Sequence, residues 1–197
     1  MKPYQSYEKD ATGARKTATE KLPAGIYICK ILGVKLEEDK GFLKVQYDIE
    51  EGEHKGFFKK QYDESKDENK KFKGLATIWL PKDDGSEKDA VTRSIFAKWT
   101  TALEDSNNGY KWDWDETKWK GKKIALAFGE VGKNIDGNNI KYTECRWPLS
   151  VEYAKSGKAK VPEFKAYPGY NATGAAQNKP SDSFVNVSGS TAEELPF

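Results

Sequence analysis

Cysteine and histidine are scarce in this sequence, and their scarcity excludes several kinds of site. The 197 residues include two cysteines, Cys29 and Cys145, and one histidine, His54. The cysteines lack a CxxC spacing, and one histidine cannot form a two-histidine metal site. A Ser-His-Asp set would have to use His54, which lies in a predicted turn and is expected to be a solvated polar residue. We therefore expect no metal and no cofactor. We also expect no catalytic activity, since no residue pattern argues for one, and a carboxylate-dependent enzyme stays open as the least supported alternative. The sparse cysteines favour a reducing, cytoplasmic location.

Long hydrophobic runs and phosphate-binding loops are also missing. No apolar stretch approaches the roughly 18–20 residues of a membrane span, and the polar N-terminus lacks the apolar centre of a signal peptide. There is no G-x-G-x-x-G or G-x-x-x-x-G-K-[ST] loop. The sequence NIDGNN at 134–139 does not place ligands at the positions of a calcium loop. These absences argue against membrane, nucleotide and calcium partners.

Arginine is rare, whereas lysine and aromatic residues are abundant. Only three of the 33 basic residues are arginine, and 13% of all residues are Phe, Trp or Tyr. Lysine binds phosphate as a mobile point charge, whereas arginine reads specific bases with its planar fork. A lysine-rich surface is therefore compatible with sequence-independent contact with a phosphate backbone. Solubility is the favoured interpretation for most of the lysines.

Alternation of apolar and polar residues with a period of two predicts a mainly β chain. The segment 86–106 differs, because its apolar residues follow helical spacing behind Ser86, a suitable N-cap. Trp99 falls on the apolar face of this helix and is expected in the core. Strands are expected at 25–36, 43–49, 57–62, 75–80, 124–128 and 140–147, with 57–62 and 75–80 forming a broken third strand.

The order of these elements predicts a fold class. Five short strands with one α-helix between strands three and four match a five-stranded Greek-key barrel of the OB-fold type. We expect an OB-fold domain over residues 23–150. A flexible N-terminal arm is expected at 1–22 and a flexible C-terminal tail, rich in small polar residues, at 151–197.

Lysine and aromatic residues interleave on the predicted strands. In an OB barrel, strands two and three and the loops joining strands one–two and four–five form the binding surface. Lysines there would follow phosphates, and rings stack on bases at ~1–3 kcal/mol per base. Packing in the barrel core is the alternative role for each ring. The candidate nucleic-acid-binding residues are Lys44, Gln46, Phe58, Lys60, Tyr62, Trp79, Lys133, Lys141, Tyr142 and Trp147.

The last five residues differ from the polar segment before them. They combine two acids, Glu193 and Glu194, with Leu195, Pro196 and a terminal Phe197. Such a tip suits capture in a basic-rimmed apolar pocket of a partner protein. Phe197 would fill the pocket, and the two acids would contact its rim.

This tip resembles that of bacterial single-stranded DNA-binding proteins, which ends Asp-Asp-Asp-Ile-Pro-Phe. Pro196 and Phe197 match outright, Leu195 replaces Ile, and two Glu replace the Asp run. Over residues 23–147 the body is more similar to the OB-fold single-stranded DNA-binding proteins of bacteriophages, through the segments 23–27, 47–56 and 120–124.

The resemblance implies sequence-independent binding and protection of single-stranded DNA in DNA replication, recombination and repair. It also implies that the tip recruits replication and recombination proteins, and that the location is the host cytoplasm if the chain is phage-encoded. Homo-oligomer formation stays open. Two other functions stay open as well, an OB-fold adaptor that binds only protein and an RNA-binding OB module.

Overall fold

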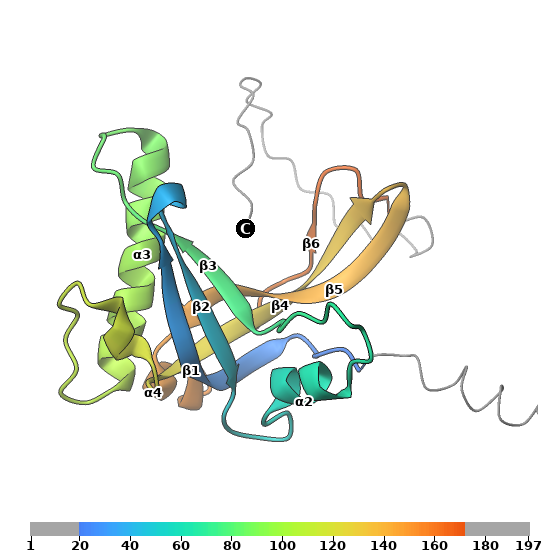
Figure 1. Ribbon diagram of the computed structural model, residues 1–197, viewed down its shortest axis with the longest axis horizontal. Coiled ribbons are helices and arrows are strands. Elements are labelled where there is room, and N and C mark those ends of the chain that lie inside the picture. The colour runs from blue at the N-terminus through green and yellow to red at the C-terminus, as the bar shows by residue number, and fades with distance from the viewer. Residues whose placement is uncertain (1–19, 172–197) are drawn as a thin grey trace, which may run out of the picture.

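Residues 20–171 are those that the computed structural model describes, and they are built on one sheet flanked by helices (Figure 1). The mainly β class predicted from the sequence is confirmed. The strands are β1 (Gly25–Glu37), β2 (Phe42–Ile49), β3 (Leu75–Trp79), β4 (Lys123–Ile135), β5 (Asn138–Leu149) and β6 (Lys165–Ala166). The helices are α2 (Phe57–Glu64), α3 (Glu87–Ser106) and α4 (Val151–Lys155), with short 3₁₀ turns at Glu38–Lys40 and Glu116–Trp119.

Strand β1 is the centre of the sheet, whose order is β3-β2-β1-β4-β5 with antiparallel pairing. The first half of β1 pairs with β4 and its second half with β2, and the register shifts between Ile31 and Gly33. The short strand β6 adds to β4 in parallel. Among the described residues, β3 and β5 do not pair with each other, so the sheet is open between its two end strands.

The core lies between the inner face of the sheet and helix α3. On β2, the inward residues Leu43, Val45 and Tyr47 are at most 2% exposed, whereas Lys44 between them is exposed. Trp99 of α3 joins the same cluster at 4% exposure. Full burial of such a side chain contributes roughly 1.5–3 kcal/mol. The prediction that Trp99 belongs to the core is therefore confirmed.

The segment 57–62, predicted as a strand, lies in helix α2, so that prediction is wrong. Gly56 has a left-handed φ of 71° and turns the chain into the helix. Asp48 on β2 then accepts hydrogen bonds from the backbone N–H groups of Phe58 (3.0 Å) and Lys59 (2.9 Å). A carboxylate from a neighbouring strand thus caps a helix that has no side-chain cap of its own. A pattern over only six residues fits both a short strand and a short helix, so it could not decide between them.

Residues 151–171 were expected in a flexible tail, but in the structure they pack on the domain. Ser150 caps α4 by accepting a hydrogen bond from the Tyr153 N–H, and the Val151 N–H donates to Ser106 Oγ of α3. The chain then returns to β4 as β6. Within residues 20–171, every helix is too short or too polar to span a lipid bilayer.

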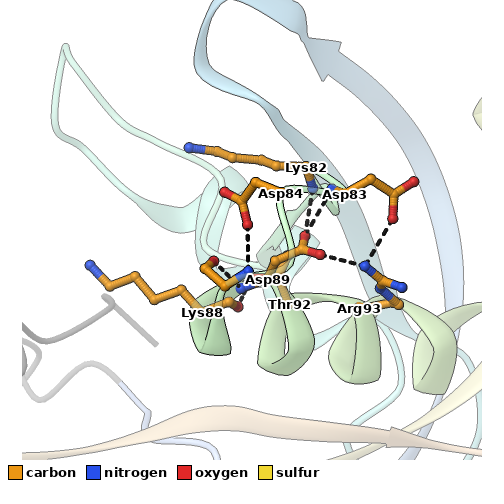
Figure 2. A network of polar contacts seen from close by, with 8 residues as sticks. Lys82, Asp83, Asp84, Lys88, Asp89, Thr92 and Arg93 are labelled. Carbon is orange, nitrogen blue, oxygen red and sulfur yellow. Dashed lines mark hydrogen bonds and ion pairs between the residues drawn. The ribbon is translucent and has the colours of Figure 1, made fainter.

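A buried carboxylate fixes the connection between β3 and α3 (Figure 2). The Asp89 side chain is 1% exposed and accepts hydrogen bonds from the backbone N–H groups of Lys82 (2.7 Å) and Asp83 (3.2 Å). Its second oxygen lies 2.5 Å from Nη2 of Arg93, which also pairs with Asp83. The Asp89 N–H donates to Ser86 Oγ, so the predicted N-cap is present. The hydrogen bond and charge of Arg93 lower the pKa of Asp89.

We predict that Asp48→Ala destabilises the domain by about 1–3 kcal/mol, because buried N–H groups at the start of α2 lose their acceptor. The measurement is urea unfolding at neutral pH. Asp63→Ala is the matched control, since Asp63 makes only an exposed ion pair with Lys59 on the same helix. Equal unfolding midpoints for the two variants would show that Asp48 is not the cap of α2.

We also predict that the stability difference between the wild type and Asp89→Asn depends on pH. Because folding lowers the Asp89 pKa, its contribution is complete above the unfolded value of about 4 and is lost as pH falls through the folded value. Thermal unfolding between pH 7 and pH 2 measures this difference. If the difference between the thermal unfolding midpoints of the wild type and Asp89→Asn stays constant from pH 7 to pH 2, the ionic role of Asp89 is contradicted.

Candidate nucleic-acid interface

A groove runs along the opening between the two end strands of the sheet, and we call it the seam groove. Its volume is about 700 Å³. One wall is β3, the other is residues 144–149 of β5, and α3 contributes Ile95, Lys98 and Trp99. The groove therefore exists because β3 and β5 stay unpaired.

Three of the predicted residues share the outer face of β2 and β3, beside the seam groove. Lys44 pairs with Thr77, Gln46 with Leu75, and Phe42 with Trp79. Residues that pair directly in an antiparallel ladder project from the same face. Leu75 and Thr77 also line the groove, so the outer face and the groove form one continuous surface. Lys44, Gln46 and Trp79 are thus brought together.

The outer face carries both charge and rings. Lys44 Nζ lies 5.7 Å from the centroid of the Phe42 ring, and that ring meets Trp79 edge-on at 5.2 Å. Glu37 on β1 lies 4.0 Å from Lys44 Nζ and 2.7 Å from Lys35 Nζ. The hydrogen bond from Lys35, aided by nearby lysine charge, lowers the pKa of Glu37. A phosphate on this face would compete with one carboxylate for two lysines.

Strand β5 supplies the opposite wall with an aromatic ring and a guanidinium. Trp147 is 37% exposed and lines the groove. Beside it, Arg146 Nη1 is buried and has no hydrogen-bond partner among the described residues, although it lies 3.5 Å from Glu144 Oε1. Burial raises the pKa of the Cys145 thiol to about 12, so this groove residue stays uncharged. The wall therefore offers a stacking surface beside a guanidinium whose buried Nη1 forms an ion pair with Glu144.

Three further predicted residues lie farther out on the β4–β5 hairpin. Lys141 and Tyr142 follow Trp147 outward along β5, and Lys133 pairs with Ile140 across the hairpin. Both lysines are exposed. Burial, together with the charge of Glu144, raises the pKa of Tyr142. The hairpin thus extends the surface of the seam groove away from the core.

The predicted residues on α2 lie elsewhere. Phe58 is 7% exposed, and its ring packs against Tyr47, Phe57 and Phe128, so it belongs to the core. Lys60 and Tyr62 line a separate depression near the start of the described chain. There Lys60 lies 3.4 Å from Glu20, and Lys70 sits over the Tyr62 ring at 4.7 Å. The prediction that they bind nucleic acid required 57–62 to be a strand, and this segment is helical.

Sequence reasoning missed several residues of the surface. Leu75 and Thr77 are outward on β3, and alternation within 75–80 carried that signal. Arg146 enters the groove wall where the β4–β5 register shifts near Ala127 and Phe128. No pattern in the sequence predicts that register shift. Lys98 reaches the groove from α3, for which the helical spacing predicts only a role in the core.

The acidic tip Glu193–Phe197 lies outside the described residues, so its predicted role stays a prediction. Within residues 20–171, no group of three or more His, Cys, Asp or Glu side chains is arranged to hold a metal ion. Comparison of the chain with protein-family models and with curated proteins finds no match, so the case for a function rests on the residues themselves.

Proposed function

We propose that this chain binds single-stranded DNA without sequence preference and protects it during replication, recombination and repair. The DNA would lie in the seam groove and on the adjoining outer face of β2 and β3. We further propose that Glu193–Phe197 recruits replication and recombination proteins. No catalytic step is part of this proposal.

The strand arrangement supports an OB-type barrel as the scaffold. Strand β1 is shared between β2 and β4, and α3 lies between β3 and β4 in chain order. The OB-fold is a partly open five-stranded barrel, and its strand-two and strand-three face binds oligonucleotides. The open seam between β3 and β5 and the outward Lys44, Gln46 and Trp79 fit that description.

The observation that carries the proposal is the chemistry of the groove walls. Trp147 offers a partly exposed ring, and Lys44 lies on the adjoining face. Arg146 Nη1 is buried, forms an ion pair with Glu144 and has no hydrogen bond within residues 20–171. Bases of a single strand expose their flat faces for stacking, whereas a duplex hides them. Phosphate oxygens would compete for these cations with Glu144, which lies 3.5 Å from Arg146 Nη1, and with Glu37, which lies 4.0 Å from Lys44 Nζ. The combination therefore favours an unpaired strand over duplex DNA.

We predict that the wild type binds a thymidine oligomer with a Kd of about micromolar or tighter at low salt, and that Trp147→Leu weakens binding about tenfold through lost stacking. Fluorescence anisotropy of a labelled oligomer measures both values. Trp114→Leu is the matched control. Trp114 is 77% exposed but stacks on Phe96, and it does not line the seam groove.

Three outcomes would count against the proposal. Absence of binding at low salt would remove the function altogether and favour an adaptor that binds only protein. Equal losses in the two tryptophan variants would remove the seam groove as the site. Tighter binding of a matched uridine RNA oligomer would favour the RNA-binding alternative.

A further inference from the structure

Residues 161–171 attach to the β4–β5 hairpin at several points (Figure 1). Strand β6 pairs in parallel with Val131 and Gly132, and the Tyr167 N–H donates to Gly132 O at 2.8 Å. At the far end, Asn139 Nδ2 donates to the backbone oxygen of Asn171 at 2.8 Å. The segment therefore forms part of the hairpin surface along much of its length.

Two glycines of β4 make this attachment possible. A Cβ on Gly129 would lie 2.7 Å from Pro162 Cβ, and one on Gly132 would lie 2.7 Å from the Tyr170 ring. Real Cβ atoms do not approach other atoms so closely. The missing side chains leave room for the segment to lie flat on the strand, which is a role of glycine at a close backbone approach.

The attached segment and the hairpin together present rings and ammonium groups in alternation. Lys141 Nζ lies 5.5 Å from the Phe164 ring centroid. Lys133 and Lys165 lie 5.8 and 4.5 Å from the Tyr167 ring centroid. All three lysines are exposed, and Phe164 is 46% exposed. We call this surface the hairpin platform, consisting of Lys133, Lys141, Phe164, Lys165, Tyr167 and Tyr170.

Acidic groups near the platform are partly occupied by other partners. The Tyr167 hydroxyl donates to Glu144 Oε1 at 2.8 Å, and the same oxygen lies 3.5 Å from Arg146 in the groove wall. Burial and this contact with Glu144 raise the pKa of Tyr167, which stays a neutral donor. Two further acids are exposed: Glu130, next to Val131 in β4, and Glu163, next to Phe164. The Tyr167–Glu144–Arg146 contacts join the platform to the seam groove.

We infer that the hairpin platform is a second contact surface for the single strand, continuing from the seam groove along β5 toward the end of the β4–β5 hairpin. This inference rests on the proposed function. Exposed rings flanked by lysines match a strand whose bases stack while its phosphates meet ammonium groups. Residues 164–170 would therefore take part in binding, whereas the sequence predicts a flexible tail there.

The test is the salt dependence of binding to a thymidine oligomer by full-length protein. Each phosphate contact with a single strand contributes about 0.7 to the slope of log K against log salt. The variant Lys133→Gln/Lys141→Gln/Lys165→Gln should therefore have a slope shallower by about 2. The control Lys111→Gln/Lys118→Gln/Lys120→Gln removes the same charge from the Trp-rich segment 110–120 and should keep a slope closer to that of the wild type.

A second variant tests the rings and keeps the charge constant. Phe164→Leu should weaken binding about tenfold without changing the slope, with thermal unfolding used to confirm an intact fold. If the platform and control lysine variants lose the same slope while the wild type binds, the platform is overturned and the proposed function stands. If the wild type does not bind single-stranded DNA at all, both are overturned.

Discussion

The absence of pairing between β3 and β5 is the constraint on which the rest of this structure depends. A closed barrel would satisfy the backbone groups of both end strands and leave no space between them. Here α3 supports the inner side of the opening with Ile95 and Trp99, and the outer side stays accessible as the seam groove. Strand β1 pairs with both β2 and β4, so it joins the two halves of the sheet above the core.

The near-zero net charge of the chain is compatible with a surface for a polyanion, because the charges are unevenly placed. Several acids are held in local contacts: Asp48 caps α2, Asp89 holds the β3–α3 connection, and Glu144 contacts Tyr167 and Arg146. The lysines of the hairpin platform instead lie beside aromatic rings. Such separation lets a chain of low net charge present a basic stripe.

Much of the sheet could be predicted from alternation, because one wet face and one buried face impose a period of two on β2 and β3. That period also placed Lys44, Gln46 and Trp79 on one face. Helix α2 could not be predicted, since its cap comes from Asp48, which lies on strand β2 and not next to the start of the helix. The folding of 161–171 could not be predicted either, because it depends on clearance above Gly129 and Gly132 in another strand. Arg146 joins the groove through a register shift that only the folded hairpin reveals.

In the proposed complex, a single strand of DNA lies in the seam groove between β3 and β5. Ultraviolet crosslinking of a thymidine oligomer to the full-length protein, followed by mapping of the modified peptides, tests it directly. We expect adducts on Trp147 and on peptides that contain β3. Adducts confined to the Trp-rich segment 110–120 or to α2 would contradict it.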